Sequence, residues 1–200
     1  MIRLALIAFL GFLAAAPAKA EIRVVEPKQP AALPAFSLTD HAGSPFTAER
    51  FKGKWSLTLI GYTYCPDVCP FVLSNMADVL NQMTVRVRPD NLPQIVFLAV
   101  DPKRDKPHLA DYVGHFGPQF VGVTGDSKEL DKLVKGLDGF YRLGKPDKDG
   151  NYEVQHSAAV IVTGPDGRIH AKLSPPLAAG EVAEYLARKQ IAYNREQRTN

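Results

Sequence analysis

The chain has 200 residues, of which 46 % are hydrophobic and 22 % are charged, and its net charge is +3 at neutral pH. A chain of this length forms one domain or two and can bury a core without disulfide bonds. The composition excludes a disordered chain, a fibrous repeat and a protein with many membrane spans, and the mild, dispersed charge favours no nucleic-acid partner.

The first 20 residues are typical of a secretory signal. Arg3 precedes an apolar run at residues 4–16, and residues 18–20 read Ala-Lys-Ala, a small-x-small cleavage pattern. The run is short for a membrane-spanning helix, which needs about 20 residues. We predict a cleaved signal peptide at residues 1–20, with an uncleaved N-terminal anchor as the alternative. Both place the body of the protein in the periplasm or an equivalent extracytoplasmic space.

The rest of the chain is expected to form an arm, one domain and a short tail. Residues 21–34 contain three prolines and little hydrophobic pattern, which predicts a flexible arm. We expect the domain to span residues 35–195 and the tail residues 196–200. At the start of the domain, a turn between residues 36–39 and 45–47 predicts an N-terminal β-hairpin.

Beyond residue 50 the sequence alternates between strand and helix patterns. Short apolar runs predict buried strands at residues 57–62, 95–100, 120–123, 159–163 and 169–173, the last two joined by a Gly-Pro-Asp-Gly turn. Apolar residues at helical spacing predict helices at residues 72–83, 109–116, 130–137 and from residue 182 onward. This order implies an α/β protein with a mixed central sheet flanked by helices, which is the thioredoxin-like arrangement.

Both cysteines stand where the first of these strands meets the first helix. Residues 61–70 read Gly-Tyr-Thr-Tyr-Cys-Pro-Asp-Val-Cys-Pro. Because Pro66 and Pro70 disfavour a regular helix through the motif, we expect Cys65 on the loop and Pro70 near the first helical turn. A helix N-terminus favours negative charge, so the thiolates are expected to be stabilised there. Thiolates attack disulfides and bind soft metals, so the motif supports either redox exchange or metal binding.

A histidine further along the chain favours metal binding. Three residues separate Cys65 from Cys69, whereas thioredoxin-type redox enzymes have two. Residues 155–158 read Gln-His-Ser-Ala and lack the cis-proline that such enzymes place opposite their cysteines. His156 stands close to that position. Two thiolates and one imidazole suit copper, as Cu(I) or Cu(II), whereas zinc usually takes a fourth ligand.

The remaining candidate residues have ordinary structural explanations. His108, Asp111 and His115 share one helical face, which is expected to be solvated. Met76 and Met83 lie on an apolar stripe and are expected to pack in the core. His41 is expected in a turn, and His170 at the start of a strand. No partner for His41 or His170 is evident from the sequence. Asp101 follows the second buried strand, so it is expected at the same sheet edge as the cysteines, where capping a helix is its alternative role.

The cysteine segment at residues 61–70 closely resembles the Sco/SenC family of copper-binding proteins. The resemblance continues, in the family's order, at residues 36–40, 53–55, 100–105, 121–125, His156 and the turn at 164–167. It covers about residues 33–190, and the cysteine segment is its most specific part. The resemblance implies a thioredoxin-like fold and a part in building the dinuclear copper centre of cytochrome c oxidase.

The resemblance also implies roles for individual residues. The family's copper ligands correspond to Cys65, Cys69 and His156, and its acidic residue after the second strand corresponds to Asp101, which is expected to dock a partner or to support the ligands. Gln155 stands where many members carry an acidic residue before the histidine. If that residue orients the imidazole, copper affinity or redox behaviour differs in this chain.

These observations predict a copper metallochaperone rather than an enzyme. Reduced Cys65 and Cys69 would bind copper with His156 and pass it to the copper-accepting subunit of cytochrome c oxidase. A thiol-disulfide reductase that keeps the cysteines of that subunit reduced needs only the two thiols and stays as the alternative, as does a redox or copper sensor. We expect a monomer whose further partners are another periplasmic copper chaperone or a thiol reductant.

Overall fold

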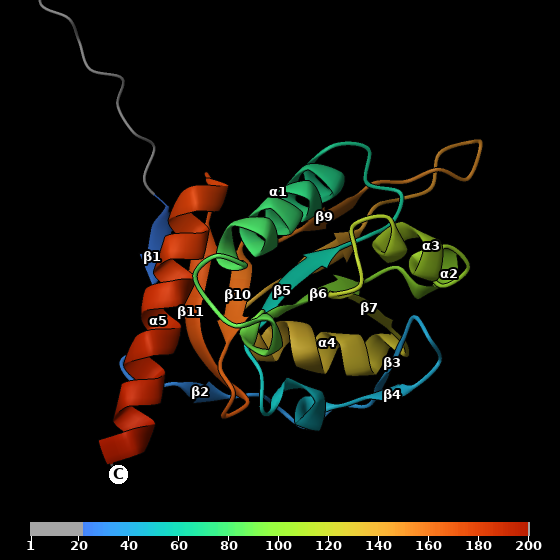
Figure 1. Ribbon diagram of the computed structural model, residues 1–200. Coiled ribbons are helices and arrows are strands. Elements are labelled where there is room, and N and C mark those ends of the chain that lie inside the picture. The colour runs from blue at the N-terminus through green and yellow to red at the C-terminus, as the bar shows by residue number, and fades with distance from the viewer. Residues whose placement is uncertain (1–21, 200) are drawn as a thin grey trace, which may run out of the picture.

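The computed structural model describes residues 22–199 and contains one large sheet with helices on both of its faces (Figure 1). The strands are β1 (Arg23–Val25), β2 (Ala31–Ala32), β3 (Leu38–Asp40), β4 (Pro45–Phe46), β5 (Ser56–Gly61), β6 (Gln94–Ala99), β7 (Phe120–Thr124), β8 (Tyr141–Leu143), β9 (Val154–His156), β10 (Val160–Thr163) and β11 (Arg168–Ser174). The helices are α1 (Val68–Met83), α2 (Pro102–Asp105), α3 (Leu109–Gly114), α4 (Ser127–Gly136) and α5 (Ala179–Thr199). The predicted mixed α/β sheet is confirmed.

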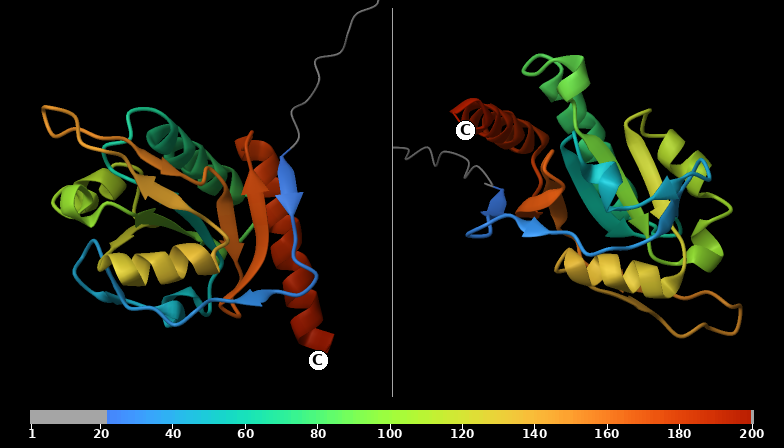
Figure 2. Two further views of the ribbon diagram at one scale, coloured as in Figure 1. Left: turned by 180° about the vertical axis from the view of Figure 1, so that it is seen from behind. Right: turned by 90° about the horizontal axis from the view of Figure 1, so that it is seen from below.

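The strand order of the large sheet is β1-β11-β10-β5-β6-β7-β3-β4, with β2 also paired to β11. The pairs β5–β6 and β6–β7 are parallel, and β10 is antiparallel to β5. Helices α1 and α5 pack together on one face, and α4 lies on the opposite face (Figure 2). Because β5 and β6 are parallel, the segments that follow them leave the sheet at the same edge, where the site described below lies.

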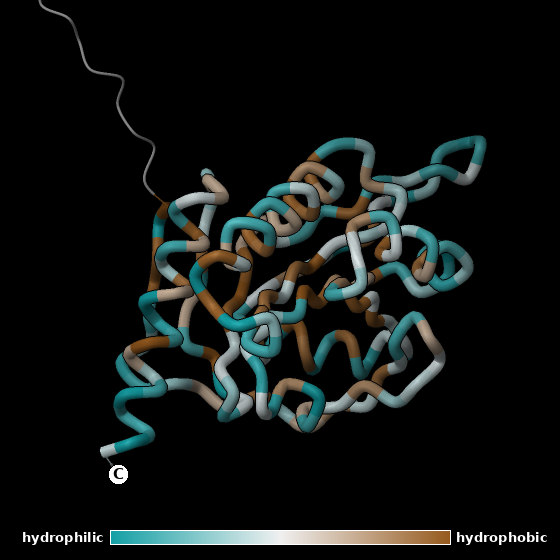
Figure 3. Tube along the Cα trace, viewed as in Figure 1, coloured by the Kyte–Doolittle hydropathy of each residue, from teal (hydrophilic) through white to brown (hydrophobic). Residues whose placement is uncertain are grey.

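The core lies along the central strands. All six residues of β5 and all six of β6 are buried, and these strands are apolar in the hydropathy trace (Figure 3). Strands covered on both faces are continuous apolar runs, which is why their positions were predicted from sequence to within a residue. The apolar residues that predicted a helix at residues 72–83 also lie in the core, where Met76 and Met83 are fully buried as predicted.

The two ends of the described chain differ from the prediction of an arm and a tail. Residues 23–25 and 31–32 pair with β11 as β1 and β2, and the carboxylate of Glu26 accepts hydrogen bonds from Tyr185 and Lys189 of α5 (2.7 Å each). Strands of two or three residues are too short to show an alternating pattern, so the sequence, with its three prolines, predicted an arm instead. At the other end, α5 continues through residues 196–199.

The predicted hairpin at residues 36–47 is confirmed as β3 and β4. The predicted signal peptide lies outside the described residues and stays a prediction. Within residues 22–199, no helix is long and apolar enough to span a membrane.

A second small sheet was not predicted. Strands β8 and β9 form an antiparallel hairpin, and the topology keeps them apart from the nine-stranded sheet. The loop that joins them is polar and exposed (Figure 3). This hairpin ends at His156.

Candidate metal centre

The cysteine segment has the local structure that its prolines predict. Cys65 lies on the loop after β5, and α1 begins at Val68, which puts Cys69 and Pro70 in the first helical turn. Proline is tolerated there because the first backbone N–H groups of a helix have no partner within the helix. The backbone N–H of Cys69 donates to the sulfur of Cys65 over 3.4 Å, and the two sulfurs lie within 4.8 Å of each other.

A glycine at the end of β5 makes room for the second thiol. A Cβ atom added at Gly61 would lie 2.8 Å from the sulfur of Cys69 and 2.6 Å from the ring of Phe97. Both distances are shorter than side chains tolerate, so the sulfur occupies the space that any other residue at this position would fill. Cys69 is consequently 2 % exposed, and Cys65 is 8 % exposed.

The imidazole of His156 meets these thiols from the hairpin. Its Nδ1 lies 3.0 Å from the carbonyl oxygen of Ser157, and its Nε2 lies 3.4 Å from the sulfur of Cys69. A carbonyl oxygen only accepts, so Nδ1 carries the proton and Nε2 presents its lone pair to the sulfur. The ring also packs edge-on against Tyr62, with ring centroids 6.0 Å apart.

The structure therefore brings together the three residues that the sequence singled out. The sulfurs of Cys65 and Cys69 and a ring nitrogen of His156 all lie within 4.8 Å of one another. Within residues 22–199, no other group of three or more His, Cys, Asp or Glu side chains has this arrangement. Two soft sulfur donors and one imidazole match the preferences of copper, and the set lacks the fourth ligand of a typical structural zinc site.

Comparison with known proteins identifies the family. The SCO1/SenC family model matches residues 25–190 of the chain. The chain belongs to the SCO1/SenC family. The human mitochondrial SCO1 homolog is 35 % identical over 163 residues, a match that covers 80 % of this chain and 54 % of the human protein. A Stutzerimonas stutzeri protein named for copper binding is 35 % identical over 147 residues, covering 73 % of this chain and 71 % of that protein.

Solved SCO1/SenC structures share the fold. Bradyrhizobium japonicum ScoI with copper bound superposes with a TM-score of 0.69 at 32 % identity, covering 80 % of this chain and 99 % of that one. The predicted thioredoxin-like fold is thereby confirmed. The chain spans about half the length of the human relative, so it corresponds to only part of that protein.

The thiols of this SCO1/SenC chain differ from the prediction in one respect. Burial raises the pKa of the Cys69 thiol, and the neighbouring Cys65 raises it further. The prediction of a stabilised thiolate does not hold for Cys69, because burial disfavours its charged form. A metal ion that binds Cys69 must displace its proton.

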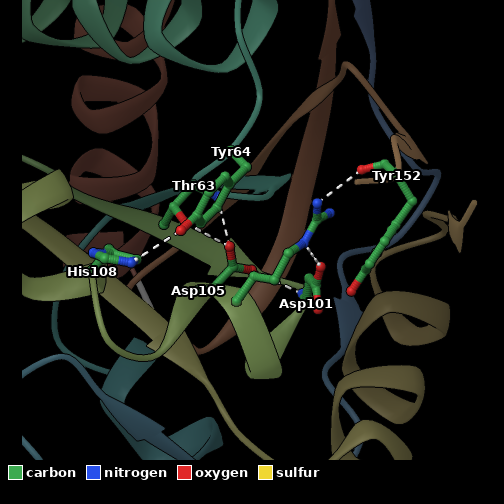
Figure 4. Close-up of polar contacts among 7 residues, drawn as sticks. Thr63, Tyr64, Asp101, Asp105, His108 and Tyr152 are labelled. Atoms are coloured by element: carbon green, nitrogen blue, oxygen red, sulfur yellow. Dashed lines mark hydrogen bonds and ion pairs between the residues drawn. The ribbon is translucent and has the colours of Figure 1, made fainter. Parts of the chain in front are cut away.

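Of the two roles predicted for Asp101, docking a partner conflicts with its burial, and supporting the ligands stays a prediction. Its side chain is 2 % exposed, and one carboxylate oxygen lies 2.5 Å from Nε of Arg104. The backbone N–H of Asp101 donates to Oδ2 of Asp105 (2.9 Å). Asp101 therefore cannot contact a partner on the rim, as the docking prediction required. It pairs instead with Arg104, and Figure 4 marks this contact with a dashed line.

Asp105 is a site residue that the sequence analysis missed. Its buried carboxylate accepts hydrogen bonds from the backbone N–H (2.7 Å) and the hydroxyl (2.8 Å) of Thr63 (Figure 4). These bonds fix the loop before Cys65 to the segment after β6. Burial raises the pKa of Asp105, and the hydrogen bonds from Thr63 oppose that rise. The signal was the second acidic residue of the Asp-Pro-Lys-Arg-Asp segment.

The other histidines lie outside the metal centre. His108, Asp111 and His115 are exposed, as predicted, although the ring of His108 contacts the hydroxyl of Tyr64 (3.1 Å). His41 and His170, for which the sequence showed no partner, each have one in the structure. Nδ1 of His41 accepts from the backbone N–H of Gly122 (3.1 Å), and Nε2 of His170 lies 3.0 Å from the carboxylate of Asp166.

Proposed function

We propose that this chain is a copper metallochaperone that delivers copper to the dinuclear copper centre of cytochrome c oxidase. The single observation that carries the proposal is the convergence of two sulfurs and Nε2 of His156 within 4.8 Å of one another, from a loop, a helix and a separate hairpin. A relative named for copper binding and a copper-bound relative support copper as the cargo.

The donor set is suited to handing the metal on. Three ligands leave a copper ion open to attack by an incoming sulfur or nitrogen from an acceptor. The ion can then pass by ligand exchange, one bond forming as another breaks, without release into water. Cu(I) needs chiefly the two soft sulfurs, whereas Cu(II) depends more strongly on the imidazole.

The proposal includes a location and partners. Residues 1–20 would direct the protein to the periplasm or an equivalent space, with residues 4–16 as an anchor if they are retained. Thiols oxidise in such a compartment, so a thiol reductant is an expected partner. The acceptor is the copper-binding subunit of the oxidase, and another periplasmic copper chaperone is an expected donor.

The proximity of two free thiols, whose sulfurs lie within 4.8 Å of each other, keeps one alternative, a thiol-disulfide reductase acting on the cysteines of the oxidase subunit. Three features count against it. The spacing of three residues differs from that of thioredoxin-type enzymes, and a raised pKa leaves the Cys69 thiol less reactive at neutral pH. A reductase also has no need of His156.

The deciding experiment compares His156→Ala with Cys65→Ser in cells that make the oxidase under limiting copper. A chaperone needs both residues, so oxidase activity should fall to a similar extent in the two variants, and added copper should partly rescue His156→Ala. His115→Ala is the matched control because His115 is an exposed histidine outside the site. Wild-type activity in His156→Ala, together with none in Cys65→Ser, would favour the reductase.

A second measurement tests delivery directly. The reduced protein should bind about one Cu(I) and lose it to an added copper-free oxidase subunit. Oxidation to a disulfide should abolish loading, because it removes both thiolates. Equal copper affinity in the reduced and oxidised protein would contradict the proposed site.

A further inference from the structure

We propose that Arg104 is the positioning residue that holds His156 at the metal centre. This inference rests on the proposed function, because it assigns to Arg104 the task of keeping the imidazole ligand beside the two thiols. Arg104 itself does not belong to the three-residue donor set.

The need for such a residue follows from the topology. Strand β9 pairs with β8 alone, and neither strand is hydrogen-bonded to the sheet that ends at the cysteine loop. Side chains therefore attach the hairpin to the body. Tyr141 of β8 donates to Asp131 of α4 (2.7 Å), at the end of the hairpin that lies away from the polar loop. On β9 itself the backbone of Val154 is hydrogen-bonded to Tyr62. Two residues before the strand, Tyr152 is held by Arg104.

Arg104 contacts Tyr152, which lies four residues before His156 in the chain. Its Nη1 donates to the carbonyl oxygen of Tyr152 (2.9 Å), and its guanidinium carbon lies 3.6 Å from the centroid of the Tyr152 ring. In Figure 4 dashed lines mark the hydrogen bond to the Tyr152 carbonyl and the ion pair with Asp101. One planar group thus holds both the backbone and the side chain of the segment that leads into β9.

The same guanidinium group also faces the cysteine loop. Its carbon lies 5.6 Å from the ring centroid of Tyr62 and 5.4 Å from that of Tyr64, and Tyr64 directly precedes Cys65. The ring of Tyr62 in turn packs against His156. Arg104 therefore lies between the segment that carries the first thiol and the hairpin that carries the imidazole.

The chemistry of this position requires arginine. The Asp101 carboxylate is almost fully buried and needs a charged partner, and the side chain of Arg104 is itself only 17 % exposed. A guanidinium group can pair with a carboxylate, donate to a carbonyl and stack on a ring at the same time, because it is flat and carries five N–H donors. A lysine ammonium can pair with Asp101 but cannot stack on Tyr152.

Loosening this contact should affect the two copper oxidation states differently. The thiols lie on the other side of the site, supported by β5 and by the bonds from Thr63 to Asp105. Cu(I) binding on the thiols should therefore persist, whereas Cu(II) binding should weaken about 10–100-fold, as is usual for groups that orient metal ligands.

The test uses the full-length reduced protein and two variants. Arg104→Lys keeps the charge beside Asp101 but loses the planar group. Tyr152→Leu removes the stacking ring and the hydrogen bond of the Tyr152 side chain to Asp101, and it keeps the accepting carbonyl. In the metal-free protein, backbone amides of β9 should exchange with deuterium at least about tenfold faster in both variants, while amides of β5 keep the wild-type rate.

The chain offers a matched control in Arg50. This arginine also pairs with a buried aspartate, Asp40 (3.3 Å), and also lies over an aromatic ring, that of Phe46 (5.4 Å), but it does so beside the N-terminal hairpin. Arg50→Lys should therefore leave exchange at β9 and Cu(II) binding unchanged.

Copper is then added as the metal alone, under anaerobic conditions and against a competing chelator. Reduced Cu(II) affinity, an altered Cu(II) spectrum and unaltered Cu(I) affinity in Arg104→Lys are the expected results. Unchanged exchange at β9 in both variants, or an equal loss of Cu(I) and Cu(II), would overturn the assignment. If the wild-type protein bound no copper, the proposed function would fail, whereas exchange at β9 would still decide whether Arg104 holds the hairpin.

Discussion

The two halves of the metal centre are built differently. The thiols follow a strand whose six residues are all buried between neighbouring strands and helices. The imidazole sits at the end of a three-residue strand in a small hairpin outside the main sheet. Local opening costs least where few backbone bonds and few buried contacts resist it. The site thus joins a rigid half that carries the two thiols to a more weakly attached half that carries the imidazole.

Hydrogen exchange gives the most direct test of this contrast and the largest expected effect. In the metal-free wild-type protein, amides of β5 should exchange only on global unfolding, and amides of β9 should exchange orders of magnitude faster through local opening. Deuterium uptake resolved by peptide or by NMR measures both. Equal protection of β5 and β9 would remove the distinction between the two halves.

Gly61→Ala should disturb the rigid half. The added methyl group would meet the sulfur of Cys69 and the ring of Phe97, and overpacking of this kind costs about 1–3 kcal/mol of unfolding free energy. Thermal or denaturant unfolding of the metal-free protein measures the loss. Gly114→Ala is the control because a Cβ atom at that position meets nothing within 4 Å, so it should change stability by less than about 1 kcal/mol. Unaltered stability in Gly61→Ala would show that the thiol has room to move.

The protonation of Cys69 gives a third test. Burial raises the pKa of this thiol, so the reactive thiolate is scarce at neutral pH. As long as the pH is below that pKa, each rise of one pH unit increases the thiolate fraction about tenfold. In a metal-free Cys65→Ser variant, alkylation of Cys69 should therefore still accelerate above pH 9. In the urea-unfolded chain the rate should level off above an ordinary thiol pKa of about 8.5. A plateau in the folded protein near that value would contradict the role of burial.

The smallest expected effect concerns Tyr141, which pairs with His156 across the hairpin. Tyr141→Phe removes the hydrogen bond to Asp131, which should cost about 0.5–1.5 kcal/mol and raise exchange at β8 slightly. Tyr112→Phe is the control, since its buried hydroxyl has no hydrogen-bond partner among the described residues and its removal should be neutral or stabilising. If Tyr141→Phe loosened β9 more than Arg104→Lys does, Tyr141 rather than Arg104 would be the main attachment of the hairpin.

The rigid half could be predicted from the sequence because its determinants are local. A continuous apolar run marks a strand buried on both faces, and the two prolines around the cysteines restrict the backbone on their own. The spacing of Cys65 and Cys69, together with the Gln-His-Ser-Ala segment, was enough to select His156 as the third donor.

The more weakly attached half could not be predicted, because its determinants are contacts between distant segments. Strands β8 and β9 have three residues each and mixed polarity, so no period stands out. The role of Arg104 depends on Tyr152, 48 residues away in the chain. The raised pKa of Cys69 depends on burial, which the helix-dipole reasoning did not include.

Strands β1 and β2, which lie in the segment predicted as a flexible arm, also affect solubility. Strand β11 has seven residues, and without β1 and β2 one side of it would present free N–H and C=O groups to solvent. Such an open edge recruits strands from other molecules and promotes aggregation. The segment before residue 35 therefore shields the sheet from edge-to-edge association. A shortened chain that begins at residue 35 would lose this shield while keeping every residue of the metal centre.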